Sequence, residues 1–324
     1  MQRDENNSRI FSTARHPILA ILLLAAASLH AQTLWRAPRP FTIEDWTCGV
    51  EGCGAAPAPP FHFEKEDLSG TTPKLTVRDA KGRTWSVKFG AEVIPECFAP
   101  RFLGAIGYFA EHTYFVASGK VEEMPKLLHR ARRVVKPDGT FARARFEPRG
   151  DKDMEFQNGK VWAWQDNPFR GTHELAGLKI VMMLLSNWDA KDARFGDDSN
   201  NAIFRTPQGE VYSMYDWGAS MGRWGGALRR DQSDCAAFAR DTPDFVRRGP
   251  DGSLVFAYQG KNSADIKDGI TVADAQWLLP YLQRAKQEQI EAALRASGAT
   301  ARQSACWAAS IEARIGELAR ASSR

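Results

Sequence analysis

Segments that alternate like β-strands come first in this chain, and most segments with helical spacing come later. Two alternating runs, at 74–78 and 84–89, flank an Asp-Ala-Lys-Gly turn and predict a β-hairpin. Further strands are expected near 114–116 and 142–146. Because sheet and helices are largely segregated along the sequence, we expect an α+β fold with two lobes.

Apolar residues spaced three or four positions apart predict the helices. One is expected over 92–109 and a second over 172–188, where Thr172 is placed as an N-cap. A capping box at 271–274 predicts a third helix, and an apolar stripe at 311–318 predicts a last one. Short strands at 202–205 and 211–215 are expected between the second and third helices.

The N-terminus has the pattern of an export signal. An Arg-containing polar stretch precedes twelve mostly apolar residues, Ile18–Leu29, and Ala31 offers a small residue for cleavage. Twelve helical residues cover roughly 18 Å, less than the ~30 Å hydrocarbon core of a bilayer. We therefore expect a signal peptide at 1–31, an exported protein (periplasmic or secreted), and no stable membrane span after cleavage.

Composition divides the remainder of the chain into three parts. Residues 32–66 are rich in Pro and Gly and are expected to form a lead-in rather than a packed element. A β-rich N-terminal lobe is expected over 67–165 and a helical C-terminal lobe over 166–324. The net charge of +4 is too small to favour a nucleic acid partner.

Five cysteines are present, which is an odd number for an exported chain. Cys48 and Cys53 lie in a Gly-rich segment, and their spacing suits a small disulfide loop. A metal knuckle is the alternative, although no second Cys or His pair has matching spacing. At least one thiol is therefore unpaired or pairs between chains.

Three charged features occur in an informative order. Lys88 lies in the second hairpin strand, and acids follow it at the start of the next predicted helix. Asp189-Ala-Lys191 comes directly after an apolar helix, and Asp216-Trp217-Gly218 comes directly after a hairpin strand. Taken singly, each feature is more often a solvated strand residue or a turn.

Together these features resemble the protein-kinase-like superfamily, in particular phosphatidylinositol kinases, HipA-type kinases and secretory-pathway kinases. Asp189-Ala-Lys191 is similar to the Asp-x-Lys of the catalytic loop, and Asp216-Trp217-Gly218 to the metal-binding Asp-Phe-Gly. Lys88 resembles the strand lysine that holds the ATP phosphates. The resemblance covers roughly 66–225 and would make this chain an exported bacterial member.

The resemblance implies roles for these residues. Asp189 would position the acceptor hydroxyl and take its proton, Lys191 would stabilise the transferred phosphoryl group, and Asp216 would bind Mg²⁺ or Mn²⁺. ATP or another nucleotide is the implied cofactor. The acceptor is left open between a protein, a lipid, a sugar and a small molecule.

Other positions depart from the family pattern. Arg194 stands where a metal-binding Asn is expected, so an insertion over 194–199 would place that role on Asn200, favoured over Asn201. The partner of Lys88 is expected to be Glu96 rather than Glu92. No full Gly-rich loop precedes Lys88, and the weak substitute for one contains Gly70 and Thr71.

Two further functions remain open. The fold would also suit a catalytically inactive pseudokinase or binding module, which the insertion, the missing Gly-rich loop and the export signal favour. An unrelated exported hydrolase or carbohydrate-binding protein is the third hypothesis, because Trp162 and Trp164 suit stacking on sugars. On the kinase-like hypothesis, 162–168 is expected where the lobes join and the adenine ring binds.

Overall fold

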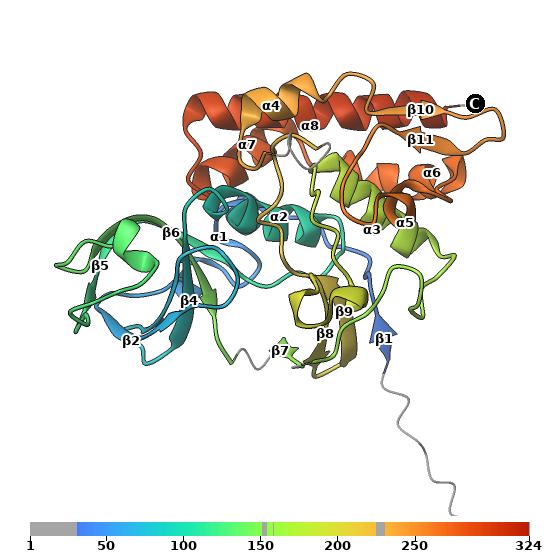
Figure 1. Cartoon of the computed structure of the whole chain (residues 1–324). Coiled ribbons are helices and arrows are strands. Elements are labelled where there is room, and N and C mark those ends of the chain that lie inside the picture. Colours follow the sequence, from blue (N-terminus) through green and yellow to red (C-terminus); the bar gives the residue numbers. More distant parts are fainter. Residues whose placement is uncertain (1–30, 151–153, 158, 225–230, 324) are drawn as a thin grey trace, which may run out of the picture. The chain divides into compact units, whose positions relative to one another are not determined.

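The computed structural model describes residues 31–150, 154–157, 159–224 and 231–323, which form a mixed α+β protein (Figure 1). The strands are β1 (Gln32–Thr33), β2 (Phe61–Asp67), β3 (Lys74–Arg78), β4 (Thr84–Phe89), β5 (Tyr114–Glu122), β6 (Thr140–Pro148), β7 (Glu155–Phe156), β8 (Asn201–Thr206), β9 (Gly209–Met214), β10 (Val246–Arg248) and β11 (Leu254–Phe256). The α-helices are α1 (Ile43–Cys48), α2 (Val93–Ala105), α3 (His173–Leu184), α4 (Cys235–Arg240), α5 (Ser263–Lys267), α6 (Val272–Leu282), α7 (Gln287–Ala296) and α8 (Ala301–Ser322). Short 3-10 helices are η1 (Cys53–Ala55), η2 (Ala131–Arg133) and η3 (Ala193–Asp198).

Five strands close into a small barrel in the order β2-β3-β4-β6-β5. The predicted hairpin is β3–β4, and a parallel pairing of β2 with β5 closes the barrel. Alternate residues of each strand point inward and form an apolar core, as the period of two requires. Leu75, Val77, Trp85, Val87 and Phe146 are members of this core.

The opposite faces of β4 and β6 carry polar side chains. Ser86 and Lys88 alternate with the core residues of β4, and Arg145 and Glu147 do the same on β6. All four are nevertheless buried, because they face a cavity rather than bulk solvent. The alternation of the barrel strands therefore places charges where the candidate site lies.

A second apolar cluster contains α2, α3 and the C-terminal helices. Helix α3 is apolar around most of its surface, which is typical of a helix buried on all sides, and α6 and α8 pack against it. Gly177 allows the close approach of α6, because a Cβ there would lie 2.9 Å from the Trp277 ring. Thr172 caps α3 as predicted, and the predicted capping box of α6 is present at Thr271 and Asp274.

The remaining strands form two smaller sheets. One has the order β1-β9-β8-β7, in which β1 runs parallel to β9 and the other pairs are antiparallel. The hairpin β8–β9 lies where the two short strands were predicted, and it ends at Met214, two residues before Asp216. Strands β10 and β11 form the second sheet.

The prediction of an unpacked lead-in over 32–66 is wrong. The segment contains α1, and Trp46 in that helix is only 2 % exposed within the helical core. A capping box between Thr42 and Asp45 starts the helix despite the surrounding Pro and Gly residues. The predicted signal peptide, apart from Ala31, falls outside the described residues, and none of the described helices is long and apolar enough to cross a membrane.

Two disulfides join parts of the described chain. Cys48 pairs with Cys53, which agrees with the predicted small loop, and Cys235 pairs with Cys306. The carboxylate of Glu44 lies beside the first pair, but sulfurs joined in a disulfide are not thiolate ligands, so a metal knuckle is disfavoured. Cys97 is free and buried in α2.

The two disulfides are expected to differ in their effect on stability. Loop-closure entropy gives about 4 kcal/mol for a loop as long as that of Cys235–Cys306 and about 2 kcal/mol for the short Cys48–Cys53 loop. Replacing both cysteines of each pair by Ala, followed by urea unfolding, should show this order. Equal losses for the two double variants would contradict it.

Candidate functional site

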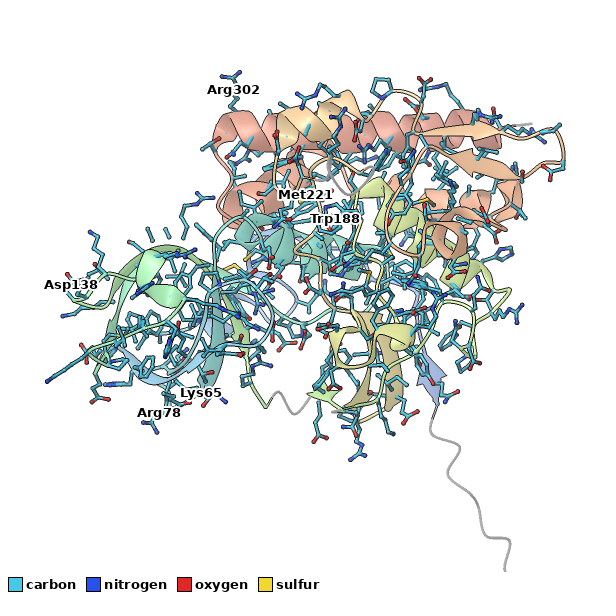
Figure 2. The ribbon with its side chains drawn as sticks, in the orientation of Figure 1. Lys65, Arg78, Asp138, Trp188, Met221 and Arg302 are labelled. Atoms are coloured by element: carbon cyan, nitrogen blue, oxygen red, sulfur yellow. A yellow bond between two sulfur atoms is a disulfide. The ribbon has the colours of Figure 1, made fainter. Side chains whose placement is uncertain are left out.

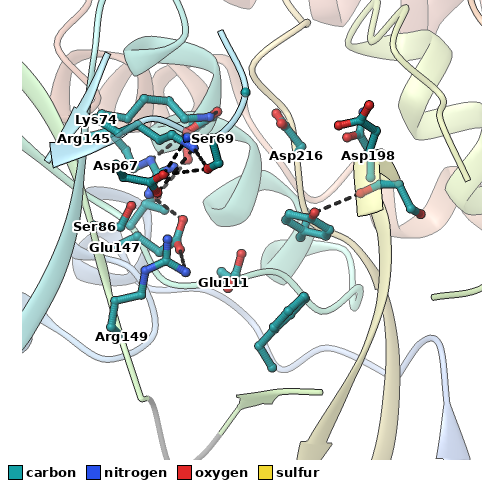
Figure 3. Close-up of a pocket in the computed structure, with 18 of the residues that line it drawn as sticks. Asp67, Ser69, Lys74, Ser86, Glu111, Arg145, Glu147, Arg149, Asp198 and Asp216 are labelled. Atoms are coloured by element: carbon teal, nitrogen blue, oxygen red, sulfur yellow. Dashed lines mark hydrogen bonds and ion pairs between the residues drawn. The ribbon is translucent and has the colours of Figure 1, made fainter. Parts of the chain in front are cut away.

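A cavity of about 350 Å³ lies against the outer face of the barrel (Figure 3). Five basic and seven acidic side chains line it, so it is strongly polar. The predicted site residues that line it are Gly70, Lys88, Glu96, Lys191, Asn200 and Asp216. Residues far apart in the sequence therefore meet in one place.

Two predicted site residues are not among those that line the cavity. Thr71 is exposed on the β2–β3 loop, while its neighbour Gly70 faces the cavity. Asp189 does not line the cavity itself, but its Oδ2 lies 3.4 Å from Nζ of Lys191, which does.

Lys88 forms an ion pair with Glu96, as expected, and also lies 3.0 Å from the Glu92 carboxylate. Glu96 is the more deeply placed partner, at 5 % exposed, because it lies one turn inside α2. Burial alone would lower the pKa of Lys88, but Glu96 and then Asp216 outweigh it and raise that pKa. Lys88 therefore stays charged within the cavity wall.

Arg145 is a site residue that the sequence interpretation missed. Its Nε donates to Oε2 of Glu96 at 2.7 Å, and its Nη1 donates to Glu147. Burial alone would lower the pKa of Arg145, but Glu147 and Glu96 outweigh it and raise that pKa. A signal was available in the sequence, since Arg145 and Glu147 alternate with the core residues Ala144 and Phe146.

Glu111 is a second missed residue, on the loop between α2 and β5. Burial, and then the neighbouring Glu147 carboxylate, raise its pKa well above the usual range. The protonated form of a carboxyl group offers both a donor and an acceptor to a ligand. Its position in a loop without periodicity gave no signal in the sequence.

The Asp216-Trp217-Gly218 turn faces the acids of α2. A Cβ on Gly218 would lie 2.8 Å from Oε1 of Glu96, so a larger residue there would displace this carboxylate. The Gly218 amide donates to Oδ1 of Asp216 at 2.9 Å, and the indole of Trp217 is buried in the helical core. Burial would raise the pKa of Asp216, but Lys88, this amide, Arg145 and Lys191 lower it below its usual value.

Asn187 links the two acidic segments. Its Oδ1 accepts from the Asp189 amide at 3.0 Å, and its Nδ2 donates to the Asp216 carbonyl at 3.1 Å. The fully buried Asn187 side chain therefore fixes the spacing between the two turns. Lys261 holds Asp189 from the other side, with Nζ 2.8 Å from Oδ1.

The residues between Lys191 and Asn200 form an excursion that contains η3, where an insertion was expected. Its ends are joined because the Asn200 amide donates to the Lys191 carbonyl at 3.0 Å. Asn200 lines the cavity, whereas Asn201 is fully buried and donates to the Trp162 carbonyl. Of the two residues, Asn200 is therefore the one that faces the cavity.

The tryptophans have a structural role here. Trp162 and Trp164 are buried in the helical core and are not among the residues that line the cavity, so the adenine site expected at 162–168 is not where the cavity lies. Phe156 and Tyr215 are the aromatic side chains that line it, with ring centroids 6.0 Å apart.

Comparison with known proteins assigns this chain to no family. Neither the family models, the curated proteins nor the solved structures contain a significant match to this chain. The assignment of roles therefore depends on the residues of the site alone.

Glu96 should contribute more to stability than Glu92. The change Glu96→Gln leaves the buried Lys88 and Arg145 side by side without their shared carboxylate, at an expected cost of about 3 kcal/mol. The matched change Glu92→Gln removes a more exposed carboxylate that pairs with Lys88 and accepts from Thr72, so about 1 kcal/mol is expected. Denaturant unfolding of both variants measures the difference, and equal costs would show that Glu96 is not the shared counter-ion.

Proposed function

We propose that this chain is an exported, metal- and nucleotide-dependent phosphotransferase of the protein-kinase-like type. The single observation that carries the proposal is one cavity in which the Lys88–Glu96 pair, Asp216 and Lys191 meet. Phosphoryl transfer needs positioned charges more than covalent chemistry from the protein, and this cavity supplies them.

The two-lobed kinase fold is part of the proposal. The division of the buried apolar residues into a barrel core and a helical core supports it, and so does the place of α2 between β4 and β5 in chain order. Helix α2 contributes Glu96 to the site on one side and its apolar residues to the helical core on the other. This double contact suits a helix that couples the lobes.

Lys88 would bind nucleotide phosphates as a point charge. Glu96 fixes the position of its ammonium group, and Arg145 in turn fixes Glu96 through a second ion pair. The protein thus holds the lysine before any ligand arrives, which reduces the ordering that binding would otherwise require.

Asp216 and Asn200 would hold Mg²⁺ or Mn²⁺, and their donor atoms fit a hard cation. Asp216 is an ionised carboxylate, since its pKa is lowered. Asn200 uses its Nδ2 to donate to the Asp189 carbonyl, which leaves its amide oxygen for the ion. The bound ion would neutralise charge on the phosphates during transfer.

Asp189 would accept the proton of the acceptor hydroxyl as its oxygen forms a bond to the terminal phosphorus. The bond from that phosphorus to the bridging oxygen breaks, and the nucleoside diphosphate leaves with the electron pair. Lys191, 3.4 Å from Asp189 and facing the cavity, would stabilise the phosphoryl oxygens during this step.

An exported location is part of the same proposal. The apolar run at 18–29 and the two disulfides support it, because disulfides persist in oxidising compartments. Such a protein requires nucleotide to be supplied in its own compartment.

A binding protein without catalysis is the second candidate, and one observation favours it. Asp189 is paired with both Lys191 and Lys261 and lies outside the cavity lining, so its carboxylate is not placed against an acceptor hydroxyl bound in the cavity. The sugar-binding alternative loses its basis, because Trp162 and Trp164 are buried.

Two substitutions distinguish these functions. Asp216→Asn should abolish the Mg²⁺-dependent thermal shift with ATP, because it removes the charged metal ligand. Asp189→Asn should leave that shift in place and reduce phosphoryl transfer or ATP hydrolysis about 100-fold or more.

The outcomes separate clearly. A wild-type protein that shows no shift with any Mg²⁺- or Mn²⁺-nucleotide would rule out both the enzyme and the nucleotide-binding module. A shift without turnover in the wild type would favour the binding module.

A further inference from the structure

A row of three basic side chains crosses the barrel on its cavity side. The strand register places Lys74 of β3 opposite Lys88 of β4, and Lys88 opposite Arg145 of β6. All three line the cavity, and Figure 3 labels Lys74 and Arg145 there. Like charges at directly opposed strand positions are destabilising, so an interaction with an anion would offset a cost that the fold otherwise carries.

The three cations differ in how well they are neutralised. Lys88 and Arg145 share the buried Glu96, and each has a second carboxylate partner. Lys74 pairs with a single carboxylate among the residues that the structure describes, Asp67 at 3.5 Å. Lys74 is therefore the cation of the row with most capacity for a further negative charge.

The β2–β3 loop covers Lys74 with groups suited to phosphate. The Nζ of Lys74 donates to Oγ of Ser69 at 2.8 Å, and a Cβ on Gly70 would lie only 3.9 Å from that nitrogen. Gly70 has φ +62°, a conformation that favours glycine. The loop is fixed at both ends, by Arg130 bonding to the Gly70 carbonyl and by Thr72 bonding to Glu92.

Ser86 supplies a further polar group in the same region. The Ser86 side chain is only 3 % exposed and lines the cavity between these strands, yet among the described residues its hydroxyl has no hydrogen-bond partner. The hydroxyl is not sealed in the interior but opens onto the cavity, where it can donate to a ligand oxygen.

We infer that Lys74, with Ser69, binds a second phosphate group next to the one that Lys88 binds, so that the site selects ligands with at least two linked phosphates. This inference rests on the proposed function and adds to it the two residues, Lys74 and Ser69, that would bind the second phosphate and exclude a monophosphate. Burial lowers the pKa of Lys74, and Lys88 lowers it further against the effect of Asp67, as expected for an under-neutralised cation.

The test compares ATP, ADP, AMP and inorganic pyrophosphate by calorimetry on the full chain with Mg²⁺. Lys74→Met should lower the affinity for ADP and ATP about tenfold or more, because it removes a charge-assisted contact. The affinity for AMP should be unchanged. Lys74→Arg keeps the charge and should bind ADP within about threefold of wild type. Lys65→Met is the matched control, because Lys65 is exposed on the same barrel and does not line the cavity (Figure 2).

A melting temperature of Lys74→Met at or above that of wild type is expected, because the change removes a like-charge neighbour of Lys88. Equal ADP affinity in wild type and Lys74→Met would overturn the inference while leaving the proposed function intact. Pyrophosphate binding that is lost in Lys74→Met, without nucleotide binding by wild type, would support the phosphate site and refute the proposed function. Failure of wild type to bind any of the four compounds would refute both.

Discussion

The Glu96 carboxylate, shared between Lys88 and Arg145, is the interaction on which the site depends. It joins two barrel strands to α2, and all three side chains are buried. Two cations at neighbouring strand positions would repel each other in a poorly solvated wall, so the carboxylate has to arrive from outside the sheet. Helix α2 delivers it, and the apolar face of that helix ties the arrangement to the helical core.

Strand alternation explains why a barrel of this size carries a polar cavity. The inward positions are filled by large apolar side chains, so the interior holds no ligand and chemistry is confined to the outer face. One residue of register slip would exchange Val87 with Lys88 and place the charge in the core. The site is therefore as strongly specified as the barrel core itself.

Much of the fold follows from local sequence pattern. The hairpin β3–β4, helices α2 and α3, and the cap of α6 all lie where periodicity and capping residues predict them. Helix α1 was missed because Pro and Gly surround a six-residue helix, whose stability comes from burying Trp46. The parallel β2–β5 pairing and the Cys235–Cys306 disulfide join distant parts of the chain, and no local pattern encodes such contacts.

The candidate site was predictable only where residues form motifs. Lys88, Lys191 and Asp216 belong to such motifs and lie together in the cavity. Arg145 has the sequence pattern of a solvated strand residue, and only the burial of its face in the structure identifies it as a site residue.

The central claim is that these side chains form one metal–nucleotide site. A crystal structure with Mn²⁺ and a non-hydrolysable ATP analogue tests it most directly. The account predicts an anomalous Mn²⁺ peak bound by Asp216 and Asn200, with phosphate oxygens on Lys88. A nucleotide bound elsewhere, or a metal without contact to Asp216, would contradict it.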